Sequence, residues 1–361
     1  MPLDHYVSLG CSGLAVSPMC LGTMTFGEDW GWGASEAESK RILERYLEAG
    51  GNFIDTANFY TRGHSEKILG DALGRHPAKR HKAVLATKFF GNMSPGDPNA
   101  GGAGRKAIYS QCEHSLRRLQ TDFIDLYWMH AWDRHTPIDE TMRALEDLVR
   151  AGKIRYIGFS DTPAWKVMEA QGIARQLGGS PVIALQIEYS LLERTVEGEL
   201  VPMALHAGLG ITPWSPLRSG VLTGKYTREN ARKGDAPRGE RVTQSLTEQA
   251  FKVIDGVKAV AGELQTTPAR VALAWVRSRP GVASPILGVR TMAQLEDNLQ
   301  ALEVQLSSAH LETLEAISRP QLNFPAEFLQ RAGNFARGGA TLNGETSMAL
   351  PLAPTSEKPA Y

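Results

Sequence analysis

The chain has 361 residues, 42% of them hydrophobic, so it is long enough to form one large domain or two ordinary ones. Its 39 Lys and Arg residues balance 39 Asp and Glu residues, which argues against binding to nucleic acid or to an acidic membrane surface. Only three cysteines occur, so we expect a cytoplasmic protein that has neither disulfides nor a metal site. No apolar stretch reaches the ~20 residues of a membrane helix, so we expect no membrane span.

The first predicted element is Tyr6–Pro18. Its residue pattern alternates around two glycines, Gly10 and Gly13, which predicts a short β-hairpin. From there to about residue 320, short apolar runs alternate with longer amphipathic stretches, which predicts parallel strands covered by helices. The expected strands are Met19–Thr23, Phe53–Asp55, Ala83–Lys88, Ile124–His130, Tyr156–Ser160, Val182–Gln186, Ile211–Trp214 and Ser284–Leu287. The clearest expected helices are Glu36–Glu48, Ser65–Leu73, Arg105–Leu119 and Ile138–Arg150.

The number of these strand–helix units indicates the fold class. Eight units within roughly 300 residues is the usual length of a closed (β/α)8 barrel. We therefore expect an α/β protein whose residues 1–320 form a TIM barrel preceded by the hairpin. The alternative is a doubly wound open sheet, which would carry a GxGxxG fingerprint after its first strand. The first strand instead continues as LGTMTFG at residues 21–27, which lacks that spacing, so the barrel is favoured.

Two regions interrupt the alternation. Arg218–Gln244, after the seventh strand, is rich in Gly, Lys and Arg and predicts a long functional loop. Residues 321–361 lack helical periodicity and predict a C-terminal tail that is partly ordered. Within this tail, the aromatic residues of Asn323–Phe335 predict a segment that packs on the barrel, near its mouth or at a subunit contact. The stretch from Gly338 to Tyr361 is expected to be disordered.

Polar residues end successive predicted strands, and in a barrel all of these ends face one mouth. Asp55 ends the second strand, Lys88 the third and His130 the fourth, while Tyr60 follows Asp55 by five positions. Each residue alone has an ordinary explanation, such as a solvated strand end or a helix cap. Together they suit carbonyl reduction. A lysine fixed by a carboxylate lowers the pKa of the tyrosine, which acts as the general acid, and the histidine orients the substrate oxygen.

An ordered series of motifs between Val7 and Ile317 carries a resemblance to a known family. The motifs include NFIDTANFY, GHSEKILGDALG, SLRRLQTDFIDLYWMH, IRYIGFSD, GITPWSPLRSGVLTGKY and SPILGVRTMAQLEDNL. They resemble the aldo-keto reductases, most closely the bacterial branches that are similar to potassium-channel β subunits. The resemblance implies an NADPH-dependent reductase of a small aldehyde or ketone. It places the catalytic tetrad on Asp55, Tyr60, Lys88 and His130, with Tyr60 as the general acid and base.

The resemblance also implies a site for NADPH or NADP+. Ser160 and Gln186 would hold the carboxamide, and Trp214 would stack on the nicotinamide ring. Arg290 would bind the ribose 2′-phosphate, which favours NADPH over NADH. Asp161 departs from the family, which usually has Asn there; an ionised Asp only accepts hydrogen bonds, so Asp161 is expected to be a weaker cofactor contact or the cap of the next helix. The other expected cofactor residues are Gly22, Thr23, Met24, Asp55, Ser215, Leu217, Ser219, Gly220, Lys225, Gly288, Val289, Gln294, Asp297 and Asn298.

Aromatic residues near the expected mouth predict a pocket for a bulky, moderately polar carbonyl compound. The expected substrate-contacting residues are Trp30, Trp32, Phe89 and Trp132, with Phe59 beside them. A phosphorylated substrate remains open, because the long loop also carries cationic side chains. These are Arg218, Arg238 and Arg241.

Three other functions deserve comparison with the reductase. An alcohol dehydrogenase working oxidatively would use the same groups, and a nucleotide-binding regulatory subunit would keep the fold with vestigial activity. A metal-dependent barrel hydrolase is disfavoured, because only His130 supplies an imidazole at the predicted strand ends. The expected partner is a small carbonyl substrate rather than nucleic acid or a membrane, and the sequence is compatible with a homo-oligomer.

Overall fold

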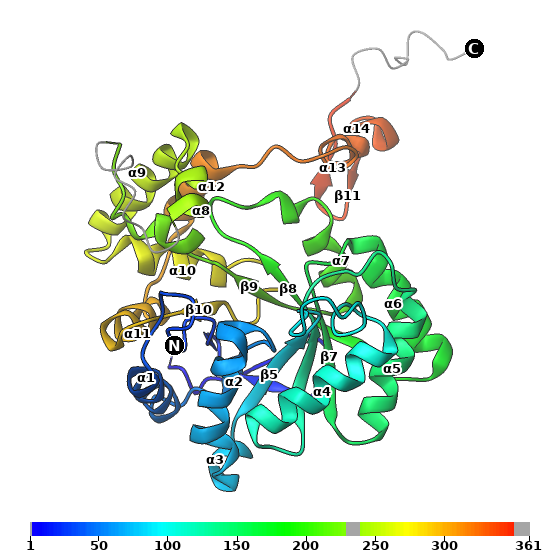
Figure 1. Ribbon diagram of the computed structural model, residues 1–361. Coiled ribbons are helices and arrows are strands. Elements are labelled where there is room, and N and C mark those ends of the chain that lie inside the picture. Colours follow the sequence, from blue (N-terminus) through cyan, green and yellow to red (C-terminus); the bar gives the residue numbers. More distant parts are fainter. Residues whose placement is uncertain (1, 229–238, 350–361) are drawn as a thin grey trace.

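A single parallel sheet forms the centre of the molecule (Figure 1). The computed structural model describes residues 2–228 and 239–349, without the side chains of residues 239–241. The eight strands follow the order β10-β3-β4-β5-β6-β7-β8-β9. A parallel bridge between Ile211 and Val282 brings the two edges of this sheet together. The sheet is therefore a nearly closed (β/α)8 barrel, and the predicted fold class is confirmed.

All eight barrel strands predicted from the sequence are present, with ends that differ by at most two residues. This agreement follows from the apolar character of the runs, since strands covered on both faces read as continuous hydrophobic segments. The strands are β3 (Cys20–Gly22), β4 (Phe53–Asp55), β5 (Val84–Phe89), β6 (Ile124–Met129), β7 (Ile154–Ser160), β8 (Val182–Glu188), β9 (Gly210–Trp214) and β10 (Ile286–Gly288).

The helices form a layer around the sheet (Figure 1). Three expected helices have the observed bounds, but Ser65–Leu73 is divided into α2 (His64–Leu69) and a wider turn at Gly70–Gly74. A Cβ atom on Gly70 or Gly74 would lie 2.2 or 2.1 Å from a carbonyl oxygen at the C-terminal end of the helix Arg105–Leu119, so this turn packs unusually closely there. The remaining helices are α1 (Glu36–Glu48), α3 (Pro77–Arg80), α4 (Arg105–Leu119), α5 (Ile138–Arg150), α6 (Ala164–Leu177), α7 (Leu200–Ala207), α8 (Gly239–Ser245), α9 (Glu248–Glu263), α10 (Pro268–Arg277), α11 (Met292–Leu299) and α12 (Ser308–Ser318).

The predicted N-terminal hairpin is present as β1 (Val7–Ser8) paired antiparallel with β2 (Ala15–Val16). Leu9 and Val16 are fully buried and pack with residues of the barrel strands. Gly10 has a φ of 62°, and a Cβ atom there would lie 2.5 Å from the carbonyl oxygen of Gly208. The hairpin therefore packs directly against the amino-terminal end of the barrel.

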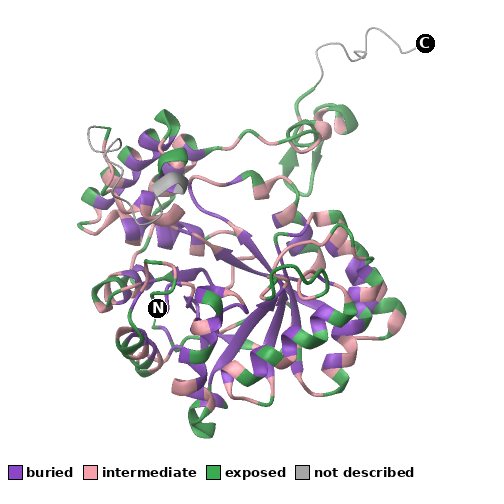
Figure 2. Ribbon diagram, in the orientation of Figure 1, coloured by how far each residue is buried: buried purple, intermediate pink, exposed green. Residues whose placement is uncertain are grey.

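The central strands are buried along almost their whole length (Figure 2). Their side chains alternate between the barrel interior and the helix layer. In β5, Val84 and Ala86 belong to the interior cluster, whereas Leu85 and Phe89 belong to the cluster beneath the helices. Lys88 follows Ala86 by two residues and so shares its inward direction. The alternation places a lysine inside the barrel and a phenylalanine outside it.

The C-terminal tail forms a small unit that lies above α7 in Figure 1. It contains α13 (Ala326–Leu329), α14 (Ala332–Arg337) and a hairpin of β11 (Thr341–Leu342) and β12 (Glu345–Thr346). The hairpin falls within the stretch that we expected to be disordered, of which residues 350–361 lie outside the described residues.

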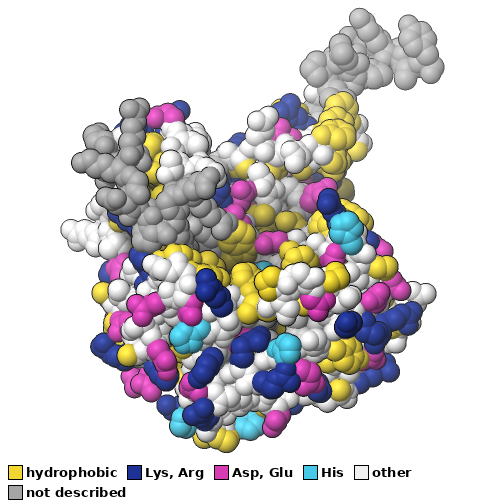
Figure 3. Space-filling view, viewed as in Figure 1, with side chains coloured by type: hydrophobic (Ala, Val, Ile, Leu, Met, Phe, Trp, Pro, Cys, Tyr) yellow, Lys and Arg dark blue, Asp and Glu magenta, His cyan; other side chains and the backbone are white. Residues whose placement is uncertain are grey.

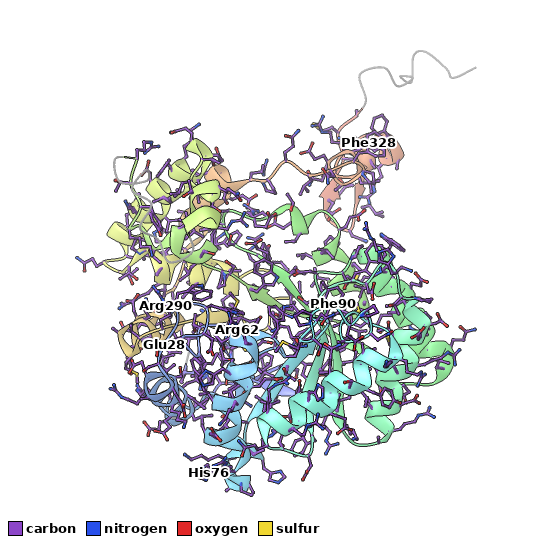
Figure 4. All side chains as sticks on the ribbon, viewed as in Figure 1. Glu28, Arg62, His76, Phe90, Arg290 and Phe328 are labelled. Carbon is purple, nitrogen blue, oxygen red and sulfur yellow. The ribbon has the colours of Figure 1, made fainter. Side chains whose placement is uncertain are left out.

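The aromatic side chains of the tail contact one another. Phe328 lies between Phe324 and Phe335, with ring centroids 6.1 and 6.0 Å away, and the three residues are 53%, 84% and 61% exposed respectively. Figure 4 shows Phe328 on this unit, apart from Arg290 and Arg62 on the barrel. The segment meets the barrel at Gly198, where a Cβ atom would lie 3.5 Å from Ala326 Cβ, while its three aromatic rings stay largely exposed. Packing near the mouth or at a subunit contact stays a prediction.

Candidate active site

A cavity of about 990 Å³ opens at the carboxyl ends of the barrel strands. Its walls come from the segments that follow β3, β4, β7, β9 and β10 and from the start of α10. Figure 3 shows hydrophobic side chains gathered around the centre of this face of the molecule. Ligands bind at this end of the barrel in proteins of this architecture, so the cavity is the candidate active site.

Lys88 connects the polar groups at the floor of the cavity. Its ammonium donates hydrogen bonds to Asp55 Oδ2 at 2.5 Å, to the carbonyl oxygen of Thr56 at 2.8 Å and to Tyr60 Oη at 3.2 Å. Lys88 is completely buried and Asp55 is nearly so. These three contacts use all three donors of the ammonium group, which fixes the phenol of Tyr60 beside a positive charge.

The strand order explains why these residues meet. Asp55 ends β4, Lys88 lies near the end of β5 and His130 directly follows β6, and these three strands are neighbours. The backbone N–H of His130 donates to the carbonyl oxygen of Phe89 at 3.2 Å. The His130 ring centroid lies 5.8 Å from that of Tyr60. The structure therefore brings the four predicted tetrad residues together.

The turn that carries Tyr60 has an unusual backbone. Thr61 and Arg62, which follow it, have φ values of 46° and 58°, and a left-handed φ is rare for a β-branched residue. Thr61 Oγ1 donates to the carbonyl oxygen of Phe26 at 2.8 Å and accepts from the backbone N–H of Ser65 at 3.0 Å. These bonds hold the strained turn and attach it to the segment after β3.

The electrostatics of the tetrad differ in one respect from the sequence prediction. Burial raises the pKa of Tyr60 above its usual value, and Lys88 lowers that pKa by less than burial raises it. The predicted effect of the ammonium is present, but a net lowering is wrong because the phenol is only 8% exposed. Burial alone would lower the pKa of Lys88, but Asp55 and then Tyr60 raise it overall, so the amine stays charged.

His130 is uncharged in this environment. Burial, and secondarily the charge of Lys88, lowers the pKa of His130 to about 2. A neutral imidazole carries one N–H donor and one acceptor nitrogen. His130 can therefore orient an oxygen of a bound molecule by a hydrogen bond, but it does not provide a positive charge.

One wall of the cavity contains the residues expected at a nicotinamide ring. Ser160 at the end of β7 is the register partner of Gln186 in β8, and Gln186 Nε2 donates to Asp55 Oδ1 at 3.1 Å. The indole N–H of Trp214 donates to Asp161 Oδ1 at 3.0 Å. The helix after β7 begins at Ala164, with Pro163 at its N-cap position and no side-chain cap. Asp161 therefore does not cap this helix.

The opposite end of the cavity lies near the start of α11. Arg290 lines it and is partly exposed, and no carboxylate of the described residues forms an ion pair with its guanidinium group. The backbone N–H of Arg290 donates to Gln294 Oε1 at 2.8 Å. Asp297 also lines the cavity, but its carboxylate pairs with Arg270 at 2.7 Å. The guanidinium group of Arg290 therefore lies near the beginning of a helix, and its forked N–H donors suit the binding of a phosphate.

Most of the predicted cofactor and tetrad residues line the cavity, but three of them do not. The side chains of Thr23 and Val289 are fully buried beneath its wall, and Lys88 lies behind Tyr60. The side chains of Thr23 and Val289 therefore do not reach the cavity, and the predicted cofactor contact of these residues stays a prediction. The predicted cofactor and tetrad residues that line the cavity are Gly22, Met24, Asp55, Tyr60, His130, Ser160, Asp161, Gln186, Trp214, Ser215, Leu217, Ser219, Gly220, Lys225, Gly288, Arg290, Gln294, Asp297 and Asn298.

The aromatic wall forms in part as predicted. Trp30 lines the cavity beside Trp32, and its ring centroid is 6.4 Å from that of Tyr60. Phe89 does not line it: the side chain points away from Lys88 into the helix layer, where it packs on Tyr127 at 5.0 Å. Trp132 also lies outside the lining and packs edge-on against another indole, that of Trp165. The predicted substrate contact of Phe89 is therefore wrong, whereas that of Trp132, which is half-buried in the loop after β6, stays a prediction.

The long loop after β9 supplies lining residues that the sequence prediction missed. Tyr226 in the loop and Val242 in α8 both line the cavity, although nothing in the local pattern distinguished them from the other residues of this segment. Arg218 lies 2.6 Å from Glu188 in an ion pair, so it is already neutralised. The other two predicted cationic side chains, those of Arg238 and Arg241, lie outside the described part of the structure.

The described residues contain no group of three or more His, Cys, Asp or Glu side chains that could hold a metal ion. None of their helices is long and apolar enough to cross a bilayer.

Comparisons with known proteins agree with this geometry. A model of the aldo/keto reductase family matches residues 18–319. The chain is 40% identical to the uncharacterized oxidoreductase YrpG of Bacillus subtilis, over 87% of this chain and 95% of that one. It is 34% identical to an aryl-alcohol dehydrogenase of Pestalotiopsis microspora, over 95% and 89% of the two chains. It is also 35% identical to a probable voltage-gated potassium channel subunit beta of Arabidopsis thaliana, over 90% and 99%.

Proposed function

The chain belongs to the aldo/keto reductase family, whose members are oxidoreductases, and on that premise we propose that it transfers hydride between NADPH and a small aldehyde or ketone. Tyr60 is the general acid and base of this reaction. One observation carries the proposal: Tyr60 Oη lies 3.2 Å from the ammonium of Lys88, which is held in turn by Asp55 at the floor of a large cavity. This arrangement both retains a proton on the phenol and stabilises the phenolate once the proton leaves.

The cavity supports NADPH as the cofactor. It extends from Tyr60 to Arg290, with Ser160, Gln186 and Trp214 lining one part of it. In the described part of the chain, the Arg290 guanidinium has no carboxylate partner, which leaves its donors available for the 2′-phosphate. NADPH supplies the hydride when it is bound there.

The residues of this chain then handle the proton and the carbonyl oxygen. The neutral His130 donates a hydrogen bond that orients this oxygen beside Tyr60. As a C–H bond forms at the carbonyl carbon, Tyr60 transfers its phenolic proton to the oxygen, which gives the alcohol. Lys88 stabilises the resulting phenolate, which takes up a proton from water. The reverse sequence oxidises an alcohol, so the same groups serve both directions.

We propose an aromatic carbonyl compound as the substrate. Trp30, Trp32 and Phe59 form an apolar wall next to Tyr60. The printed name of one relative, an aryl-alcohol dehydrogenase, refers to an aromatic alcohol. Flat rings pack well on such a wall in offset or edge-on arrangements.

The test is the Tyr60→Phe variant, which keeps the ring and removes the acid. We expect turnover of an unactivated aromatic aldehyde to fall about 10²–10⁴-fold, the usual contribution of general acid catalysis. The NADPH dissociation constant should change by less than about threefold, because the ring remains. Tyr109→Phe is the matched control, since Tyr109 lies on the surface and bonds Asp147 there. Near-normal turnover by Tyr60→Phe would refute the assignment, and NADPH binding without turnover by the unchanged protein would indicate a regulatory subunit.

A further inference from the structure

We propose that Gln111 is a positioning residue of the proposed reaction: through the turn that follows β5, it fixes the ring of Phe59 and thereby sets the preference of the site for aromatic carbonyl compounds. The inference rests on the proposed function. It concerns how the ring of a substrate is recognised, whereas hydride and proton transfer are left as described above.

Gln111 joins two loops at the mouth of the barrel. It lies in α4, is only 4% exposed, and accepts two hydrogen bonds at its side-chain oxygen Oε1. One comes from the backbone N–H of Phe90 at 2.9 Å, directly after β5, and the other from Asn58 Nδ2 at 2.7 Å, in the loop after β4. Asn58 Nδ2 also donates to the carbonyl oxygen of Gly91 at 2.7 Å. A single buried amide therefore holds the loops that follow two strands with tetrad residues.

The backbone that Gln111 holds is strained. Phe90, labelled in Figure 4, has a φ of 116°, which a bulky residue rarely adopts. Such a conformation persists only where neighbouring contacts enforce it, and it is concentrated at functional sites. Here the N–H of Phe90 is bonded to Gln111, and its carbonyl oxygen accepts from the backbone N–H of Gly102 at 2.9 Å. Loss of the Gln111 acceptor would therefore allow this turn to relax.

The ring of Phe59 packs on the same turn. A Cβ atom on Gly91, the residue after Phe90, would lie 2.4 Å from Cδ1 of Phe59, so the ring rests directly on the backbone there. Phe59 lines the cavity, and its ring centroid is 5.4 Å from that of Tyr60 and 5.1 Å from that of His130. A shift of the turn therefore moves a part of the aromatic wall that lies beside both tetrad residues.

The consequence of such a shift depends on the substrate. An aromatic carbonyl compound can pack its ring on Phe59 in an offset or edge-on arrangement, which stabilises it beside Tyr60. A short aliphatic aldehyde has no ring to pack. A displaced Phe59 should therefore weaken the use of aromatic substrates selectively, whereas a general disturbance of the fold would affect both kinds of substrate.

Two substitutions disturb this link from opposite sides. Gln111→Met keeps an unbranched side chain of similar volume and removes the acceptor of both hydrogen bonds. Gly91→Ala keeps that acceptor and displaces the Phe59 ring, because the added methyl group would occupy its position. Gln111→Glu is the conservative variant, because it keeps an acceptor oxygen at this place and burial favours its neutral form.

The experiment measures kcat and KM for benzaldehyde and for butanal with saturating NADPH. We expect Gln111→Met and Gly91→Ala to lower kcat/KM for benzaldehyde, relative to butanal, by about three- to tenfold, the range that one aromatic contact contributes. Most of this loss should appear in KM, and Gln111→Glu should retain most of the preference. In a Phe59→Leu background, the same two substitutions should change the preference by less than about twofold, because their effect passes through that ring.

Gln171→Met is the matched control. Gln171 is a buried glutamine of α6, 5% exposed, that bonds both backbone groups of Val182 at the start of β8, the end of the strand away from the mouth. Its substitution should lower the free energy of unfolding, as Gln111→Met does, and leave the substrate preference unchanged. The control therefore separates the structural effect of losing a buried amide from the effect on Phe59.

A selective loss for benzaldehyde that Phe59→Leu abolishes supports the inference. Equal losses for both aldehydes, or a loss that persists in the Phe59→Leu background, overturn it and leave the proposed function intact. An unaltered preference in Gly91→Ala also overturns it, even where Gln111→Met does not fold. If the unchanged protein oxidises NADPH with neither aldehyde, the proposed function itself is refuted, and the inference with it.

Discussion

Removing the ammonium of Lys88 should destabilise the barrel strongly. Lys88 is fully buried, and it contacts Asp55 Oδ2 at 2.5 Å, the Thr56 carbonyl oxygen at 2.8 Å and Tyr60 Oη at 3.2 Å. The substitution Lys88→Met keeps an unbranched chain of similar volume but removes the charge and all three donors. Asp55 then retains its hydrogen bond from Gln186 at 3.1 Å, without a counter-charge.

The structure sets the size of this effect. Removing one partner of a buried ion pair typically costs about 3–5 kcal/mol, because the other charge is left buried and unpaired. Adding Asp55→Asn to Lys88→Met replaces that charge with a neutral amide. The double variant should therefore recover about 2 kcal/mol or more of the loss, and its remaining deficit should reflect lost hydrogen bonds at about 1 kcal/mol each.

The pH dependence gives a second check on the same variant. Burial raises the pKa of Asp55, and Lys88 opposes this rise. Without Lys88 the folded-state pKa of Asp55 should rise further above its unfolded value, so the folded state binds the extra proton. Stability then falls as the pH rises through that folded pKa. Lys88→Met should lose more stability between pH 5.5 and 8 than the double variant does.

Urea denaturation of the four proteins, at pH 5.5 and at pH 8, measures these free energies directly. The unchanged protein and Asp55→Asn complete the double-mutant cycle. Comparable m-values would show that the same folded state is being compared. A free energy of unfolding of Lys88→Met within about 1 kcal/mol of the unchanged protein at pH 8, or a further loss on adding Asp55→Asn, would contradict a penalty for an unpaired buried charge.

Three further predictions concern the cofactor, the histidine and the tail. Arg290→Ala should weaken the binding of NADPH by about 1.5–3 kcal/mol, the value of a hydrogen bond to a charged group, and should leave the binding of NADH almost unchanged. Equal losses of binding free energy for the two cofactors, measured by calorimetry, would point to a structural role. Because the folded pKa of His130 is about 2, the unfolded state alone takes up this proton below about pH 6.5. His130→Gln should therefore lose less stability than the unchanged protein between pH 7 and pH 5 in urea melts, and parallel losses would contradict this. Deleting residues 321–361 should change substrate KM or assembly while sparing NADPH affinity; identical kinetics, size and melting temperature would show the tail to be dispensable.

The strands and the tetrad were predictable because two simple rules act together. Apolar runs identify buried parallel strands, and the barrel architecture brings their carboxyl ends to one mouth. Asp55, Lys88 and His130 lie at or just beyond such ends on three adjacent strands, so their positions in the sequence suffice to predict that they meet. The same alternation shows why Phe89 was wrongly assigned: it is one residue beyond Lys88 and must face the opposite side.

The loops contain what the sequence could not specify. Trp132 follows β6 in a loop, where no periodicity determines which way an indole turns, and it packs on Trp165 instead of entering the cavity. Nothing in the local sequence predicts the left-handed backbone of Thr61, because β-branched residues avoid that conformation. Its geometry comes from hydrogen bonds to Phe26 and Ser65, and Phe26 lies 35 residues away in the chain. Contacts between distant loops are the part of the site that the sequence patterns do not encode.

The raised pKa of Tyr60 shows how such loop contacts enter the chemistry. Burial is its largest cause, and part of that burial comes from the rings of Phe59 and Trp30, 5.4 and 6.4 Å away. The segment that carries Trp30 is attached to the start of α2 by Asp29 Oδ2, which lies 2.8 Å from His64 Nδ1. The aromatic wall therefore does more than shape a substrate pocket. In the proposed reaction, the exclusion of water from the phenol would keep the proton on Tyr60 until a carbonyl oxygen and the charge of Lys88 make its transfer favourable.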